Sequence, residues 1–146
     1  MPLIYRVMKV ENGRPKVGTS GSCLGARVGP LPPPQVPDIT PDQYDNVHRG
    51  TGGMSVAPTL LDLPPMIVPE TYLRMQPKAM SRDKKARIWK MGAGPFVAGP
   101  IAEALELRVD AKDNTHGFVE PDKVMPVSRY QEALAATKDK WDEVKI

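Results

Sequence analysis

The sequence is poor in residues that bind metals or form cross-links: it has a single cysteine and two histidines in 146 residues. One cysteine cannot form an intramolecular disulfide, and Cys23, His48 and His116 are too few for a zinc-type cluster. We therefore expect neither a disulfide framework nor a metal site. The chain also lacks a secretory leader and any run of 18 apolar residues. These absences predict a cytoplasmic protein without a membrane span, and they leave open export by a route without a signal peptide.

Aromatic residues and net charge are also scarce, at 5% of the chain and +3. Nucleic-acid-binding modules typically combine a basic surface with recognisable aromatic or helical motifs, so this composition argues against nucleic-acid binding. The densest basic cluster lies in the stretch 82–90 and consists of Arg82, Lys84, Lys85, Arg87 and Lys90. Such a run is most often a solvated face, but it can also attract phosphate or an acidic partner.

Proline is abundant, with 17 residues, more than twice the usual share of about 5%. Each proline removes a backbone donor and disrupts helix interiors and central strands, so long helices and broad regular sheets are excluded. The length suits one domain, and we expect residues 1–146 to form a single α+β domain of short strands and long proline-rich loops. The prolines gather at 30–37 and 58–69, where they predict stiff connections on either side of a glycine-rich segment.

Strands are predicted where β-rich or alternating segments are bounded by turn residues. They are residues 3–10, 54–57, 84–91, 104–109 and 115–120. Residues 18–37 fit no regular element. Thr40-Pro41-Asp42-Gln43 has the form of a helix start and predicts one or two turns up to Val47. A longer C-terminal helix is predicted from a capping box at Ser128 and Gln131, with one face formed by Tyr130, Leu134, Thr137 and Trp141.

Arg6 is the most informative single residue. The period of two along a strand places it on the same face as Ile4 and Met8. An arginine that points inward needs a carboxylate, a phosphate or several carbonyls, because an unpaired buried charge costs several kcal/mol. Two interpretations remain open: a structural arginine, or a ligand-binding one whose planar fork suits a phosphate.

Three further side chains are candidates for chemistry. Ser55 follows two glycines, but no Gly-x-Ser-x-Gly elbow surrounds it, and the glycines at 50–53 lack the Gly-Lys-Ser/Thr ending of a P-loop. His116 and Glu120 share one face of a predicted strand, about 13 Å apart at about 3.3 Å per residue, so they are not direct hydrogen-bond partners. A cleft could use both against different parts of one ligand, although a single histidine near a strand end is by default a surface residue.

In their order along the chain, these segments resemble a known family. The matching segments are Ile4-Tyr5-Arg6, Thr51-Gly52-Gly53-Met54-Ser55-Val56, Thr115 to Met125, and then Tyr130, Leu134 and Trp141. They resemble the type VI secretion exported toxins with an ADP-ribosyltransferase-like fold, together with their bacterial and fungal relatives. The resemblance implies two small, mostly antiparallel sheets that form a split core with short peripheral helices, and an NAD-binding cleft between them.

The resemblance also implies roles for particular residues. Ser55, His116 and Glu120 would be catalytic, and Tyr5, Arg6, Gly53 and Ser55 would bind NAD. A carboxylate such as Glu120 would stabilise the positive charge that develops on the ribose. This chain departs from the family pattern at Met54, where the toxin has threonine, and Glu120 occupies a position that is not reliably acidic in the family.

The function implied by the resemblance is that of an NAD-dependent ADP-ribosyltransferase-like toxin. It would act in the cytoplasm of a target cell, modify a protein target and be neutralised by an immunity protein. The alternative is a non-catalytic module of the same fold that binds a protein partner through residues 30–37 and 82–90. The two differ in whether NAD is consumed, by transfer or by hydrolysis.

Overall fold

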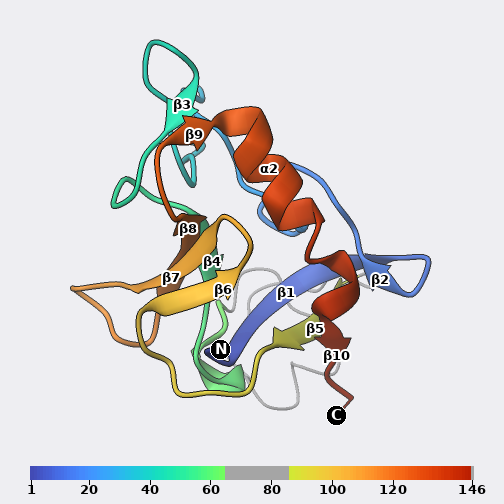
Figure 1. Cartoon of the computed structure of the whole chain (residues 1–146). Coiled ribbons are helices and arrows are strands. Elements are labelled where there is room, and N and C mark those ends of the chain that lie inside the picture. Colours follow the sequence, from blue (N-terminus) through green and yellow to red (C-terminus); the bar gives the residue numbers. More distant parts are fainter. Residues whose placement is uncertain (65–85, 146) are drawn as a thin grey trace.

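The computed structural model describes residues 1–64 and 86–145, which form an α+β fold of mostly antiparallel strands with one short α-helix among them (Figure 1). The strands are β1 (Ile4–Glu11), β2 (Arg14–Pro15), β3 (Asn46–Val47), β4 (Met54–Val56), β5 (Ala86–Met91), β6 (Gly99–Ala102), β7 (Leu105–Val109), β8 (Gly117–Pro121), β9 (Met125–Pro126) and β10 (Asp142–Glu143). The helices are α2 (Val127–Ala135) and the 3-10 turns η1 (Leu60–Asp62) and η2 (Lys138–Lys140). None of these helices is long and apolar enough to cross a membrane.

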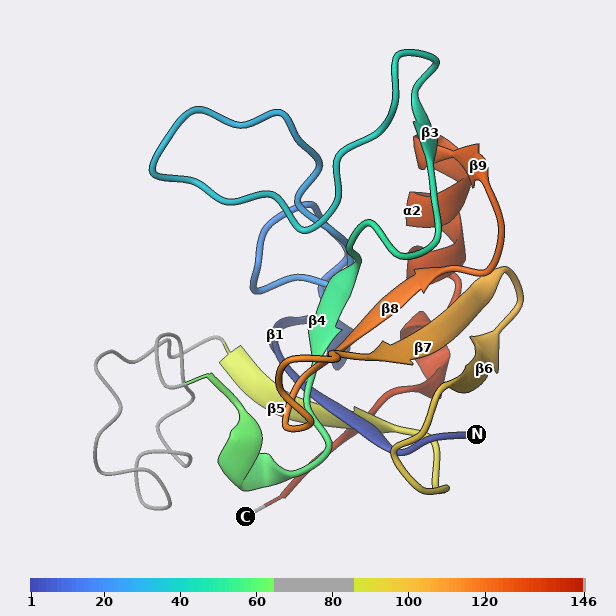
Figure 2. The same ribbon diagram turned by 90° about the vertical axis from the view of Figure 1, so that its left-hand side faces the viewer.

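The strands form two four-stranded sheets and one two-stranded sheet. The first has the order β10-β5-β1-β2, the second β4-β8-β7-β6, and β3 pairs with β9. The two larger sheets meet where β4 ends, because Tyr5 of β1 and Ala57 exchange backbone hydrogen bonds of 2.8 and 2.9 Å. Figure 2 shows this corner, with β4 rising from the β1–β5 pair. The α+β class and the mostly antiparallel sheets agree with the sequence-based prediction.

The main core lies between the two larger sheets and α2. It gathers side chains from both sheets, among them Ile4 and Trp89 from the first and Leu107 and Val119 from the second. The buried indole of Trp89 donates to the Met8 carbonyl at 3.1 Å, so its polar group is satisfied within the core. A smaller cluster packs on the other face of β1 and β5 and consists of Val7, Ala57, Leu63, Ala86 and Ile88.

The predicted helix from Thr40 to Val47 is wrong. Residues Asn46–Val47 instead form β3, which pairs with β9. The Asp42 carboxylate accepts the backbone N–H groups of Tyr44 and Asn46 at 2.8 and 3.1 Å. An aspartate side chain that caps its own following residues offers the backbone an alternative to the helix, which is why the same residues form a turn.

The C-terminal helix exists but is shorter than predicted, since α2 ends at Ala135. Its predicted capping box is absent: Pro126 is the N-cap, and the Gln131 side chain binds both the N–H and the carbonyl of Ala26. Trp141 is fully buried beyond the helix, where its indole N–H donates to Thr137 Oγ1 at 3.0 Å. Gln131 therefore makes a tertiary contact in place of its predicted cap, and Trp141 is buried from a position outside the helix.

The strand predictions at 3–10, 54–57 and 104–109 are confirmed with small changes in their ends. The last strand starts later than predicted, at Gly117, because Thr115 belongs to a turn in which its N–H binds the Asp113 carboxylate at 2.9 Å. It also runs through Pro121, which pairs with Leu105. The prediction for 84–91 is confirmed from Ala86 on; Lys84 and Lys85 lie outside the described residues, as does the proline-rich stretch from Pro65 to Pro69.

The segment 18–37 contains no named strand or helix, as predicted from its glycines and prolines. Its outer part, 28–37, projects from the body as an open blue-to-cyan loop (Figure 2). The loop is closed at its base, because the N–H groups of Asp38 and Ile39 both donate to the Arg27 carbonyl, at 2.8 and 3.2 Å.

Tyr130 anchors α2 to the second sheet, so its hydroxyl offers a test of this packing. The fully buried hydroxyl donates to the Val119 carbonyl at 2.6 Å and accepts the Met54 N–H at 3.1 Å, and burial raises the pKa of this phenol. We expect Tyr130→Phe to lower the free energy of unfolding by about 1–3 kcal/mol, because a buried donor and a buried acceptor lose their partner. Urea denaturation measures this loss. Tyr44→Phe, at a side chain that is 75% exposed, is the control and should change stability little.

Candidate functional site

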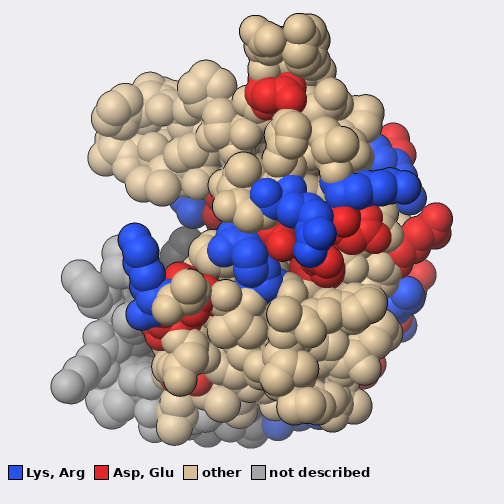
Figure 3. All heavy atoms as spheres, turned by 60° about the vertical axis from the view of Figure 1, so that its left-hand side comes forward, with Lys and Arg blue, Asp and Glu red and all other residues tan. Residues whose placement is uncertain are grey.

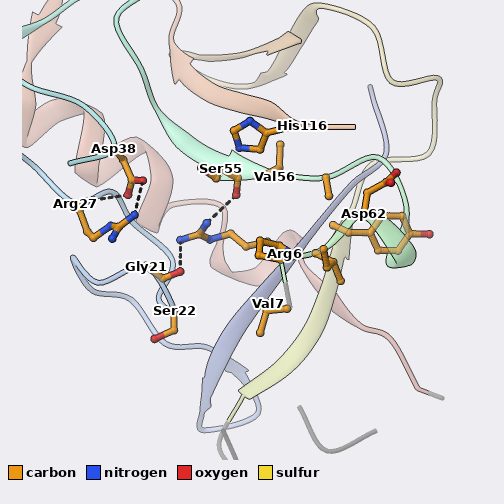
Figure 4. A pocket seen from close by; sticks show the side chains of 14 residues that line it. Arg6, Val7, Gly21, Ser22, Arg27, Asp38, Ser55, Val56, Asp62 and His116 are labelled. Carbon is orange, nitrogen blue, oxygen red and sulfur yellow. Dashed lines mark hydrogen bonds and ion pairs between the residues drawn. The ribbon is translucent and has the colours of Figure 1, made fainter. Parts of the chain in front are cut away.

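A cavity of about 390 Å³ lies where β1, β4, the segment 21–38 and η1 meet. This volume falls within the range of about 300–1,000 Å³ that is usual for small-molecule sites. Four of the site residues predicted from the sequence line it: Tyr5 and Arg6 on β1, Ser55 on β4, and His116 directly before β8. Figure 4 shows the Arg6 guanidinium near Ser55, His116 beyond that serine, and Asp62 at the opposite end. The fold thus brings together four residues that lie up to 111 positions apart, from Tyr5 to His116.

The Arg6 guanidinium is held by backbone carbonyls. It donates to Ser55 O at 2.7 Å, to Gly21 O at 3.1 Å, and to Cys23 O at 3.0 Å from Nη2 and 3.3 Å from Nε. A guanidinium has five N–H groups, so these four contacts leave one N–H of Nη1 without a partner among the described residues. Of the two alternatives from the sequence, the structure shows an inward arginine satisfied by carbonyls, and it also places that arginine on the cavity wall.

No carboxylate of the described residues lies within ion-pair distance of Arg6, although this side chain is only 6% exposed. Burial lowers the pKa of the guanidinium, and the charge of nearby Asp38 opposes that effect. Arginine still remains protonated in proteins, because its ordinary pKa lies far above neutral pH. The cavity wall therefore carries a buried positive charge that carbonyl dipoles stabilise without neutralising it.

Ser55 faces the cavity because of the alternation along β4. Its neighbours Met54 and Val56 are buried in the main core, which turns the side chain of Ser55 to the opposite face. Its hydroxyl makes no hydrogen bond with a described residue. Ser55 therefore presents a free hydroxyl near the Arg6 guanidinium, to which its own carbonyl is bound.

His116 reaches the cavity from the neighbouring strand, since Val56 of β4 pairs with Gly117 of β8. Its Nδ1 lies 3.3 Å from Asp110 Oδ2, and its ring makes an edge contact with Phe118 at a centroid distance of 4.6 Å. The pKa of Asp110 is lowered, first by the N–H of Lys112 and then by this contact with His116. If the shared proton lies on Nδ1, the other ring nitrogen, Nε2, is an acceptor.

Glu120 and Gly53, the other two site residues predicted from the sequence, do not line the cavity. Glu120 is 3% exposed and does not line the cavity; its Oε2 accepts the Gly50 N–H at 2.7 Å and the Arg108 guanidinium at 3.0 Å. A Cβ added to Gly53 would lie 2.6 Å from the Val119 carbonyl, so this glycine permits the close pairing of β4 with β8. Both residues shape the strands around the cavity, and neither contacts it.

Sequence reasoning missed the charged residues that line the rest of the cavity, which are Arg27, Asp38 and Asp62. Arg27 and Asp38 pair through a guanidinium contact of 3.4 Å and a bond of 2.7 Å from the Arg27 N–H to Asp38 Oδ2. One signal was present: Arg27 is the only charged residue between Lys16 and Asp38. A lone charge in a glycine- and proline-rich loop is a candidate for binding, since loops carry function when a rigid scaffold positions them.

The charged side chains on one face of the described surface are of both signs (Figure 3). Figure 3 shows Lys and Arg interspersed with Asp and Glu on one face. Among the described residues, Arg49 pairs with Glu106 and Arg108 with Glu120. That mixture differs from the single-sign surface typical of nucleic-acid binding. Arg82, Lys84 and Lys85 of the basic stretch lie outside the described residues. Within the described ranges, no group of three His, Cys, Asp or Glu side chains could hold a metal ion.

No protein-family model matches this chain, and no curated protein matches it.

The different settings of Glu120 and Ser55 predict different effects on stability. Glu120→Gln removes the charge that pairs with Arg108, and we expect the free energy of unfolding to fall by about 1–3 kcal/mol, as for the loss of a hydrogen bond to a charged group. Ser55→Ala removes a hydroxyl without a described partner and should change stability by less than about 0.5 kcal/mol. Urea denaturation of both variants measures the difference. An unchanged stability in Glu120→Gln would mean that this carboxylate is not structural.

Proposed function

We propose that this protein is an NAD-using ADP-ribosyltransferase-like toxin that acts in the cytoplasm of a target cell. One observation carries the proposal: Arg6, Ser55 and His116, which resemble site residues of that toxin family, line a single cavity of ligand-binding size. They come from three segments separated by 49 and 61 positions. Only the fold brings residues that are so far apart in the sequence to the same cavity.

The residues present suit NAD as a ligand. Its two phosphates are anionic, and the cavity offers the Arg6 and Arg27 guanidinium groups, each with an N–H group that no described residue accepts. Its ribose hydroxyls need polar partners, which Ser55 and the carboxylate of Asp62 can supply. Arginine forks match phosphate oxygens in both geometry and charge.

The chemistry divides between the ligand and the chain. In the reaction, the bond between a ribose carbon of NAD and the nicotinamide nitrogen breaks, and its electron pair leaves on nicotinamide. An acceptor oxygen or nitrogen forms a bond to that carbon and loses a proton. His116 takes up this proton at Nε2, and Asp110 at Nδ1 stabilises the resulting imidazolium. Ser55 orients the ribose through its hydroxyl. Arg6 holds an anionic group by charge, in a buried setting where charge interactions are strong.

Met54, which stands where the toxin family has threonine, does not alter the lining of the cavity. The Met54 side chain is 1% exposed and belongs to the main core, on the face of β4 that is turned away from the cavity. A threonine hydroxyl at this position would point into the core as well. The cavity face of the motif depends on Ser55, which this chain retains.

The alternative is a non-catalytic module of the same fold that binds a protein partner. Two observations favour it. Glu120 is engaged by Arg108 and Gly50 and does not reach the cavity, and the loop 30–37 is largely exposed, with Val36 at 67%. This alternative predicts that the protein leaves NAD unchanged.

NAD binding is expected to stabilise the purified protein. At about one hundred times its Kd, NAD should add about 2.7 kcal/mol of stability, or about 5–10 °C in Tm for a chain of this size. Ser55→Ala and His116→Ala should reduce both this shift and the release of nicotinamide from NAD. Arg6→Ala is a poorer probe, because three carbonyls lose their donor and the fold itself is weakened.

Two matched variants control this experiment. His48 also pairs with an aspartate, Asp42, but does not line the cavity, and Ser128 is exposed on α2. His48→Ala and Ser128→Ala should behave like the wild type. Binding of NAD without its consumption at millimolar concentration would favour the non-catalytic alternative, and neither binding nor consumption would overturn the proposal.

The toxin part of the proposal needs a cellular test. Expression of the wild type should arrest the growth of a host cell, whereas Ser55→Ala and His116→Ala should accumulate normally, because the arrest depends on the cavity. Growth and protein level measured over induction give the result. Equal arrest by all three proteins would point to an interaction outside the cavity.

A further inference from the structure

Arg27 carries a guanidinium donor that is buried and has no hydrogen-bond partner among the described residues. Its Nε is shielded from solvent and has no hydrogen-bond partner within residues 1–64 and 86–145. A buried donor without an acceptor costs about 1–3 kcal/mol, so such groups usually mark a missing partner. This donor lies on a side chain that lines the same cavity as Arg6.

The contact between Arg27 and Asp38 leaves the guanidinium free to change partners. Asp38 is held independently of it, because Asp38 Oδ2 accepts the Arg27 backbone N–H at 2.7 Å. The guanidinium itself makes one long contact of 3.4 Å, from Nη2 to Asp38 Oδ1. The Arg27 side chain is 41% exposed and the Asp38 side chain 7%, so the carboxylate is fixed while the guanidinium borders the cavity and solvent.

The charges at this end of the cavity favour an anion. Arg6 and Arg27 contribute two positive charges and Asp38 one negative charge, whereas Asp62 lies at the opposite end (Figure 4). Arg6 already gives four of its N–H groups to carbonyls. Arg27 is therefore the group with the most donors left for a ligand, and its planar fork suits a phosphate.

The backbone fixes Arg27 at this place. The carbonyl of Arg27 accepts the N–H groups of Asp38 and Ile39, and the carbonyl of Asp38 accepts the Gly53 N–H at 2.9 Å. The base of the proline-rich loop is thereby joined to the segment that carries Ser55. A ligand could contact Arg27 and Ser55 at once without any rearrangement of the chain.

We infer that Arg27 is a phosphate-binding residue of this cavity, with Asp38 holding its guanidinium in place until the phosphate takes over that contact. The inference rests on the proposed function for the identity of the phosphate, which would be the pyrophosphate of NAD. It assigns a role to a residue outside the segments that resemble the toxin family. It also predicts that recognition of the phosphates and recognition of the nicotinamide ribose can be separated by mutation.

The test compares ligands with and without phosphate on wild type and Arg27→Gln. The probes are ADP-ribose and inorganic pyrophosphate on one side and nicotinamide riboside on the other, with affinities from calorimetric titration. We expect Arg27→Gln to weaken ADP-ribose binding about ten- to hundredfold, as for the loss of charged hydrogen bonds, and to leave nicotinamide riboside binding unchanged. Arg129→Gln is the control, because Arg129 has nearly the same exposure, 42%, and a similar carboxylate contact of 3.6 Å with Glu103, but does not line the cavity.

Two further variants guard against a loss of folding. Arg27→Lys keeps the charge and the apolar stem but not the fork, and should lose less affinity for ADP-ribose than Arg27→Gln. Asp38→Asn keeps an oxygen for the Arg27 N–H and removes the competing charge, so it should bind ADP-ribose no more weakly than the wild type. A Tm without ligand for each variant shows that it is folded.

The outcomes separate this inference from the proposed function. Equal affinity of wild type and Arg27→Gln for ADP-ribose would overturn the inference, as would equal losses for ADP-ribose and nicotinamide riboside, or tenfold weaker binding in Asp38→Asn. If NAD is consumed with the same KM by wild type and Arg27→Gln, the inference fails and the proposed function stands. If pyrophosphate and ADP-ribose bind through Arg27 but NAD is not consumed, the inference stands and the proposed function fails.

Discussion

The buried guanidinium of Arg6 is the constraint on which the arrangement of this molecule depends. A buried charge must be solvated by the protein, and here the carbonyls of Gly21, Cys23 and Ser55 provide that solvation. Because the three carbonyls come from the segment 21–23 and from β4, a single side chain on β1 joins both to the first sheet. The positions of the cavity walls therefore follow from the requirement that this charge be satisfied.

The same interaction connects stability to binding. Carbonyl dipoles stabilise the charge of Arg6 without cancelling it, as a carboxylate would, so the cavity keeps a positive potential that an anionic ligand can use. A salt bridge at this position would have held the sheets together equally well and removed that potential. The carbonyl arrangement therefore satisfies the guanidinium and leaves its positive charge at the cavity wall.

Much of the scaffold could be predicted from local patterns, and the failures have physical causes. Alternation along the chain was enough to place Leu105, Leu107 and Val109 on a strand and to turn Arg6 inward, because the period of two needs no tertiary information. The helix predicted at Thr40 fails because the Asp42 side chain binds the following N–H groups, which a propensity argument cannot weigh against a helical cap. Gln131 likewise does not cap the helix as predicted. Its side chain forms two hydrogen bonds to the backbone of Ala26, which lies 105 residues away in the sequence.

The sequence singled out four residues that line the cavity but not Arg27, Asp38 and Asp62, which line it as well. Tyr5, Arg6, Ser55 and His116 belong to short segments singled out in the sequence, whereas Glu120 and Gly53 share those segments and do not line the cavity, because the pattern does not say how far along the sheet the cavity extends. Arg27 and Asp38 could be brought together only by closing an intervening loop of ten residues. The prolines of this loop predict that it has no regular structure, but they do not predict that its two ends pair. Within a loop that proline keeps irregular, backbone hydrogen bonds pair the two ends. That pairing places a second guanidinium, of Arg27, beside Arg6 at the cavity wall.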